Sequence, residues 1–247
     1  MSVEPESQTP REPDGELSII EAVRKRQIQQ ARAWQADQVC PSKALALAYD
    51  SRHRRGEAIR ALRTKLLLLR DRTRESGALA VLSPCSGEGR SHLCAELAIA
   101  FAQLGSRTLL VDADLRWPRQ HLLFATHNQW GLVQTLCHSE PPRVHGVQGL
   151  EHLSVLTAGA APPNPLELLS GERFQQLVRS WQHDYEFVIF DTPPVTQYSD
   201  GLAIASAARR ALIVCRAPVT SFKDLKEMTR QLAAAPTHVV GAVINQF

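Results

Sequence analysis

From Gly77 to the end of the chain, short apolar segments alternate with segments of helical character. The apolar segments are nearly continuous runs, which are typical of strands buried on both faces of a parallel sheet. We expect strands over 78–83, 108–114, 153–159, 187–194, 211–217 and 238–245, and helices over 91–105, 173–182, 202–209 and 224–235. This alternation predicts an α/β fold with a mostly parallel sheet covered by helices on both faces.

The chain before Gly77 has a different character. Residues 1–16 are rich in proline, glutamate and serine, which predicts a disordered tail. Residues 17–38 carry a few apolar positions in a polar helical pattern, and 39–56 have the composition of a linker. A strong helix is predicted from Glu57, because leucine and isoleucine recur there at helical spacing. The predicted division is a tail (1–16), an N-terminal helix and linker (17–56) and a main domain (57–247).

Composition limits the class of protein and its compartment. With 44% hydrophobic and 21% charged residues, the 247-residue chain has the make-up of a globular protein. A net charge of +3 is too small to indicate a nucleic-acid partner. Five scattered cysteines predict free thiols in a reducing compartment. The N-terminus is no signal peptide, and no apolar run approaches the roughly 20 residues of a membrane helix, so we expect a cytoplasmic protein with at most peripheral membrane association.

The segment SPCSGEGRS, residues 83–91, follows a predicted strand and opens a predicted helix, as a phosphate-binding loop does. It has Arg90 where that motif has lysine, and it lacks the motif's first glycine. Two glycines let backbone N–H groups turn toward phosphate oxygens, and a serine hydroxyl at the helix start suits Mg²⁺. The residues predicted to bind nucleotide here are Ser86, Gly87, Glu88, Gly89, Arg90, Ser91 and His92. A plain strand-to-helix turn is the alternative that this segment alone leaves open.

Two further segments place carboxylates after predicted strands. The segment VDADLR, at 111–116, brings Asp112 and Asp114 to the sheet edge where open α/β folds bind ligands. The segment VIFDTPP adds Asp191 after a buried strand, in the pattern of a Walker B segment. Beside a phosphate loop, such carboxylates suit a magnesium site and the activation of a nucleophile. Capping of a following helix is the alternative for the first pair.

These three elements, in this order, resemble the bacterial tyrosine kinases (BY-kinases) of exopolysaccharide chain-length control, within the MinD/ParA group of P-loop ATPases. Glu57, Arg60 and Arg63 match that family's E-x-x-R-x-x-R motif, and PPNPLELL at 162–169 resembles another of its segments. The nearest subgroup is the EpsG type, in which the kinase is a separate chain from its membrane activator and the loop also occurs with arginine.

The resemblance implies ATP as the phosphoryl donor and Mg²⁺ as the cofactor. It implies that Asp112 is the base that accepts a tyrosine proton, that Asp114 and Arg90 complete the catalytic set, and that Asn245 reaches the adenine. The residues it assigns to the metal are Ser91, Asp112, Asp114 and Asp191. It further implies a homo-oligomer formed through the E-x-x-R-x-x-R motif. The implied partner is the cytoplasmic tail of a transmembrane polysaccharide co-polymerase, which would hold the protein at the inner membrane.

The tyrosines depart from the family pattern. The sequence ends at Phe247, directly after the last predicted strand, without the tyrosine cluster for which the family is named. Its tyrosines are Tyr49, Tyr185 and Tyr198, of which Tyr198 is expected nearest the site. Two alternatives to a kinase therefore remain: a nucleotide-loaded scaffold without phosphotransfer, and a MinD/ParA-like positioning ATPase. The loop lacks the extra lysine of that ATPase group, which argues against the second.

Overall fold

The computed structural model describes residues 38–50, 53–73, 77–138 and 141–246. The predicted disordered tail, and the helix predicted over 17–38 apart from its last residue, lie outside the described residues. None of the helices in the described ranges is long and apolar enough to cross a membrane.

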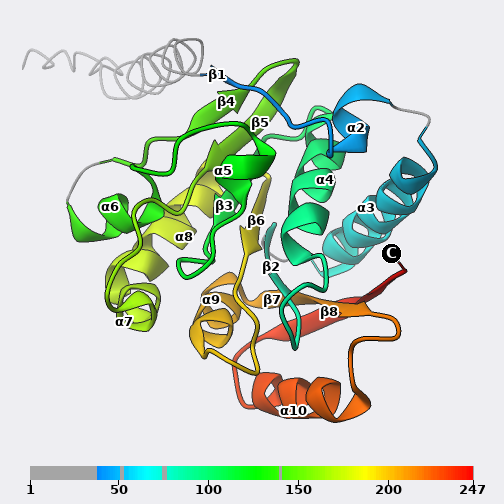
Figure 1. The fold of residues 1–247 in the computed structure, drawn as a ribbon, viewed down its shortest axis with the longest axis vertical. Helices are drawn as coiled ribbons and strands as arrows, with labels where there is room; N and C mark the ends of the chain where they lie inside the picture. The colour runs from blue at the N-terminus through cyan, green and yellow to red at the C-terminus, as the bar shows by residue number, and fades with distance from the viewer. Residues whose placement is uncertain (1–37, 51–52, 74–76, 139–140, 247) are drawn as a thin grey trace, which may run out of the picture. The chain divides into compact units, whose positions relative to one another are not determined.

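An eight-stranded sheet forms the centre of the domain (Figure 1). Its strands are β1 (Gln38–Val39), β2 (Ala78–Leu82), β3 (Thr108–Asp112), β4 (His145–Val147), β5 (Leu150–Leu156), β6 (Phe187–Asp191), β7 (Arg210–Arg216) and β8 (His238–Asn245). They lie in the order β1-β4-β5-β3-β6-β2-β7-β8, and every neighbouring pair is parallel except β4 with β5. The predicted mostly parallel α/β sheet is therefore confirmed.

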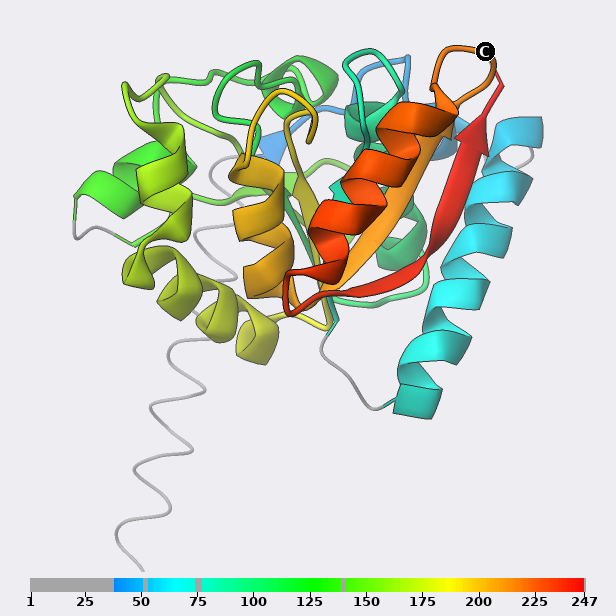
Figure 2. The same ribbon diagram turned by 90° about the horizontal axis from the view of Figure 1, so that it is seen from below.

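Different helices cover the two faces of this sheet. The helices are α2 (Ala46–Tyr49), α3 (Arg54–Thr73), α4 (Arg90–Ala102), α5 (Gln120–Leu123), α6 (Leu132–Cys137), α7 (Pro165–Ser170), α8 (Glu172–Asp184), α9 (Asp200–Ala208) and α10 (Phe222–Ala233). Side chains of α6 to α10 join one hydrophobic cluster with the sheet, and those of α2, α3 and α4 join a second cluster on the opposite face. In Figure 2, β7 and β8 pass between α10 and α3.

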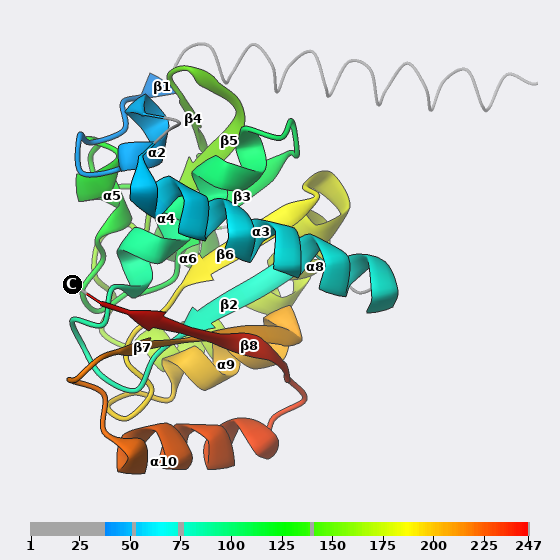
Figure 3. The same ribbon diagram turned by 90° about the vertical axis from the view of Figure 1, so that its right-hand side faces the viewer.

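Helix α4 explains why the phosphate-loop helix is so apolar in sequence. It is buried along nearly its whole length, because it lies between the sheet and α3, which crosses in front of it in Figure 3. Phe101 of α4 stacks on Phe187 of β6 with ring centroids 3.9 Å apart. Burial of such side chains contributes about 1.5–3 kcal/mol each, so this helix is fixed firmly against the strands that carry the site.

The segment predicted as a linker, 39–56, has more structure than its composition indicates. It contributes to β1, forms α2 and begins α3, and Leu45 and Leu47 are buried. Glu96 of α4 accepts a hydrogen bond from the Leu47 N–H at 3.2 Å, and Gln103 donates one to the Leu47 carbonyl at 2.8 Å. Polar composition concealed this packing, because the contacts that hold the segment come from residues distant in sequence.

Candidate active site

The site lies where three neighbouring parallel strands end. β6 pairs with β3 on one side and with β2 on the other, so the segments that follow all three strands meet at one sheet edge. Asp112 of β3 and Asp191 of β6 are direct partners in the register. The phosphate loop follows β2, which pairs Val81 with Asp191. The three predicted elements are thus brought together by the strand order.

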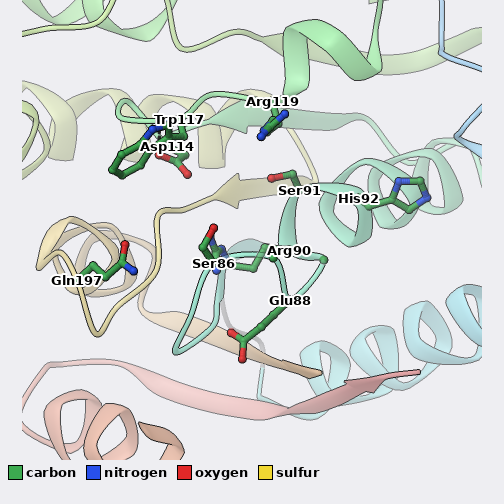
Figure 4. Close-up of a pocket in the computed structure, with 11 residues that line it drawn as sticks. Ser86, Glu88, Arg90, Ser91, His92, Asp114, Trp117, Arg119 and Gln197 are labelled. Atoms are coloured by element: carbon green, nitrogen blue, oxygen red, sulfur yellow. Dashed lines mark hydrogen bonds between the residues drawn. The ribbon is translucent and has the colours of Figure 1, made fainter. Parts of the chain in front are cut away.

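The loop between β2 and α4 has the backbone of an anion-binding turn. Gly87 and Gly89 have φ of 77° and 90°, in the left-handed region that favours glycine, and Gly89 is the N-cap of α4. The helix N-terminus adds partial positive charge to this turn. A pocket of about 410 Å³ opens over it (Figure 4). Its lining residues are Ser86, Gly87, Glu88, Gly89, Arg90, Ser91, His92, Asp114, Trp117, Arg119 and Gln197.

Arg90 is tied to the protein beneath the loop. Its side chain is buried, with Nε donating to the Thr192 carbonyl at 2.8 Å and Nη1 donating to the Cys85 carbonyl at 2.7 Å. Nη1 also donates to the Ser83 hydroxyl. A lysine ammonium is a single point of contact, whereas the guanidinium fork spans both the loop and the residue after β6. The sequence predicted a phosphate contact from Arg90 and did not predict this anchoring role.

The other half of the loop is held by the last two strands. Buried Glu88 accepts hydrogen bonds from the Cys85 N–H at 2.7 Å and from the Thr220 hydroxyl. Asn245, at the end of β8, donates from Nδ2 to the Glu88 carbonyl at 2.7 Å. Asn245 therefore lies against the loop but does not line the pocket, and Glu88 faces the protein as well as the pocket.

The two aspartates in register are completely buried. Asp112 Oδ2 accepts hydrogen bonds from the N–H groups of Arg119 and Gln120, at 3.0 and 2.8 Å, so it caps the start of α5. Its Oδ1 has no hydrogen-bond partner among the residues that the structure describes. Burial and the charge of Asp191 raise the pKa of Asp112 well above its usual range. Asp112 thus combines the capping role that the sequence left open with an unpartnered oxygen at the site.

Asp191 is linked to the loop through Gln120, which sequence analysis missed. Buried Gln120 donates from Nε2 to Asp191 Oδ2 at 2.8 Å and to the Ser91 carbonyl at 3.0 Å. Burial raises the pKa of Asp191 to about 6, although Arg90 and hydrogen bonds from Ser91 and Gln120 act in the opposite direction. Gln120 stands eight positions after Asp112 in a segment without a motif, so only the tertiary structure reveals it.

Of the three predicted aspartates, Asp114 is the one that lines the pocket. Its Oδ1 accepts hydrogen bonds from the N–H groups of Arg116 and Trp117, at 3.2 and 2.9 Å. Arg116 in turn makes a two-point ion pair with Asp200, at 2.6 and 3.1 Å. Asp200 is completely buried, so this pair fixes the segment after β3 against the start of α9. Arg116 belongs to the predicted motif at 111–116, whereas no pattern in the sequence indicates Asp200.

His92 on α4 and the charged motif on α3 are the remaining predicted positions. His92 lines the pocket and lies 3.6 Å from Glu96, four residues along α4. On α3, Arg60 pairs with exposed Glu57 at 2.5 Å. Arg63 instead donates to the Ala100 carbonyl of α4 at 2.8 Å, so its guanidinium also docks α3 within its own chain.

The pKa of Asp191 predicts a pH dependence of stability. A carboxyl whose pKa is raised on folding supports the fold below its unfolded value, and that support is lost as pH rises from about 4 to about 6. Asp191→Asn removes this loss, so we expect its free energy of unfolding to rise relative to wild type between pH 4 and 7, by up to about 3 kcal/mol, with a higher melting temperature as the readout. Exposed Asp184→Asn is the control. If the stability difference between Asp191→Asn and wild type stays constant from pH 4 to 7, the raised pKa of Asp191 is contradicted.

Comparisons with known proteins agree with this geometry. The ParA family, described as NUBPL iron-transfer P-loop NTPase, matches residues 76–246. Tyrosine-protein kinase YwqD of Bacillus subtilis (strain 168) is 35% identical over 173 residues, which cover 70% of this chain and 73% of YwqD. The chain belongs to the bacterial tyrosine kinases. The putative tyrosine-protein kinase CapB of Staphylococcus aureus is 31% identical over 195 residues, covering 77% of this chain and 84% of CapB.

A solved structure extends the likeness of this bacterial tyrosine kinase to its fold. The crystal structure of the chimerical protein CapA2B2 superposes with a TM-score of 0.77 at 28% identity, over 85% of this chain and 92% of that one. The P-loop NTPase family and fold imply that the chain binds a nucleotide together with a divalent metal. The described residues include no cluster of three or more histidine, cysteine or acidic side chains that could hold a metal alone.

Mg²⁺ usually takes one or two carboxylates together with phosphate oxygens and water. The unpartnered Oδ1 of buried Asp112 is an oxygen of the type that such an ion binds. Asp191 lies beside it in register, and the hydroxyl of Ser91 hydrogen-bonds Asp191. The chemistry of this donor set therefore suits a magnesium–nucleotide complex.

Proposed function

We propose that this chain is an ATP-dependent protein-tyrosine kinase that regulates exopolysaccharide polymerisation or export together with a membrane chain-length determinant. The observation that carries the proposal is the register of Asp112 and Asp191 beside a glycine-rich loop, in a chain related to tyrosine kinases. In this proposal the two acidic groups lie where the phosphoryl donor and the acceptor would meet.

In this proposal the loop binds ATP. Backbone N–H groups from Gly87 to Ser91 would hold the phosphates at the start of α4, where the helix dipole favours negative charge. Asn245 would use its remaining amide groups for the adenine, since Nδ2 already donates to the loop. Ser91, Asp112, Asp114 and Asp191 would hold Mg²⁺, which supplies charge neutralisation on the transferred phosphoryl group.

Asp112 would act as the base for phosphoryl transfer. Its carboxylate would accept the phenolic proton of a tyrosine as the phenol oxygen bonds to the γ-phosphorus, and the bond from that phosphorus to the bridging oxygen of ADP breaks. Burial and the neighbouring carboxylate raise the pKa of Asp112, which brings its proton affinity closer to that needed near neutral pH. Asp114 lines the pocket and would orient the ligands, while Arg90, which donates to the Thr192 carbonyl, would hold the loop in position for the nucleotide.

The partner and the assembly are also part of the proposal. The cytoplasmic tail of a transmembrane polysaccharide co-polymerase would bind the kinase and keep it at the inner membrane. Homo-oligomers would form through α3, where Glu57 is exposed and Arg60 is half-buried. Arg63 supports this surface from behind by fixing α3 to α4.

The test is to incubate the purified full chain with Mg-ATP, alone and with the cytoplasmic tail of the proposed co-polymerase partner. Mass spectrometry then maps the phosphorylated residues on both proteins. We expect phosphotyrosine that depends on ATP and increases with the tail. Nucleotide binding without phosphotyrosine on either protein would instead support a nucleotide-loaded scaffold. Hydrolysis stimulated by DNA or lipid, without protein phosphorylation, would support a positioning ATPase.

A further inference from the structure

A large aromatic side chain stands exposed at an otherwise polar pocket. Trp117 lines the pocket directly after the Asp114 segment, and 54% of its surface is exposed. In Figure 4, Trp117 and Asp114 lie together on one side of the pocket, across from Glu88 of the loop. An exposed tryptophan leaves apolar surface in water, so a position at a binding pocket calls for a ligand that covers it.

The position of this ring is fixed by two segments of the chain. The Trp117 ring is tilted by 48° against that of Tyr198, with ring centroids 5.5 Å apart. The Arg116 guanidinium lies 4.0 Å from the centre of the Tyr198 ring, and buried Asp200 holds that guanidinium by its two-point ion pair. Tyr198 is therefore held by a half-buried arginine that a buried aspartate anchors, and this support pre-organises the aromatic pair for binding.

A backbone hydrogen bond also holds Trp117 beside Asp114. The backbone N–H of Trp117 donates to Asp114 Oδ1 at 2.9 Å, so the indole side chain begins next to the Asp114 carboxylate in the pocket. Asn245, the predicted adenine contact, holds the loop from the β8 side, whereas Gln197 and Trp117 line the pocket from the segments after β6 and β3. A second aromatic ligand could therefore reach the pocket on the Trp117 side without competing for the adenine position.

We propose that Trp117 and Tyr198 form an aromatic subsite that receives the phenol ring of the acceptor tyrosine and presents its hydroxyl to the carboxylates. This inference rests on the proposed kinase function and adds the surface that selects the acceptor. Stacking suits this ligand, because aromatic pairs prefer tilted or offset contacts of the kind already present between the two side chains. The acceptor that fits is a tyrosine in an extended protein segment, with its ring inserted beside Asp114.

The test uses Trp117→Leu, which keeps an apolar side chain but removes the π system, and Trp117→Phe, which restores an aromatic ring. Trp130→Leu is the matched control, since Trp130 is likewise a largely exposed tryptophan, at 42%, but is not part of the pocket lining. The acceptor probe is a glutamate–tyrosine copolymer with Mg-ATP. We expect its KM to rise about 5- to 10-fold in Trp117→Leu, with recovery in Trp117→Phe and no change in the control.

Two further measurements keep this inference separate from the kinase proposal. We expect wild type and Trp117→Leu to bind a non-hydrolysable ATP analogue with equal affinity. If Trp117→Leu instead binds the analogue more weakly and its KM for the copolymer is unchanged, the proposed subsite is wrong. Calorimetric binding of the copolymer to analogue-loaded protein needs no phosphoryl transfer. Weaker binding in Trp117→Leu alone would support the subsite even if no kinase activity were found, whereas equal binding by all variants would reject it.

Discussion

Asp112→Asn is expected to lower tyrosine phosphorylation by at least about 100-fold while the fold remains intact, because a general base contributes roughly 10²–10⁴ in rate. An asparagine can still accept the N–H groups of Arg119 and Gln120 through its amide oxygen, so the start of α5 keeps its cap. It also removes a buried negative charge beside Asp191, which burial makes unfavourable. Phosphotyrosine formation and the melting temperature at pH 7.5 are the measurements, and we expect the second to be equal to or above that of wild type.

Asp114→Asn is the decisive comparison for that result, since Asp114 lines the pocket and Asp112 lies fully buried behind it. If Asp112 is the base, Asp112→Asn loses more activity than Asp114→Asn. The rate of the wild-type protein then rises with pH as Asp112 is deprotonated. If Asp114→Asn abolishes the reaction and Asp112→Asn retains it, the base is Asp114 and Asp112 is a structural cap. Exposed Asp184→Asn controls for the loss of a surface charge.

The central sheet was predictable because its strands are local apolar runs. β8 occupies 238–245 as expected, and β2, β3 and β7 differ from their predicted ranges by two residues or fewer at either end. The strand predicted over 187–194 ends at Asp191, because the two prolines that follow cannot continue the ladder. The edge strand β1 and its neighbour β4 were missed, since segments of two and three residues carry no periodic signal.

The candidate site was predictable only where its residues belong to a motif. Asp112, Asp191 and the loop were predictable because the two aspartates end buried strands and the loop directly follows one, and the strand order then brings them together. Gln120 and Asp200 were not found, although they hold Asp191 and Arg116. Each lies in a segment whose composition is that of a loop or a helix start, so its partner is defined by tertiary structure alone.

Arg90→Ala is expected to destabilise the domain by roughly 3–5 kcal/mol, because buried oxygens lose their donors at about 1–3 kcal/mol each. The affected acceptors are the Thr192 and Cys85 carbonyls and the Ser83 hydroxyl. For a domain of this size the change corresponds to a fall of about 10 °C in melting temperature. We also expect at least about a 10-fold weaker affinity for Mg-ATP, since the loop loses its link to the residue after β6 and a positive charge beside the phosphates.

Arg90→Lys separates the anchoring role from the charge. A lysine keeps the positive charge that the phosphate-loop motif requires, but its single ammonium cannot reproduce a fork that reaches Thr192 through Nε and Cys85 through Nη1. Nucleotide affinity should therefore recover further than thermal stability does, and exposed Arg179→Ala should change neither. A lysine variant with wild-type stability would mean that the fork adds nothing to the anchoring. An alanine variant with wild-type stability would mean that these hydrogen bonds do not hold the loop, and that arginine at this position serves the phosphates alone.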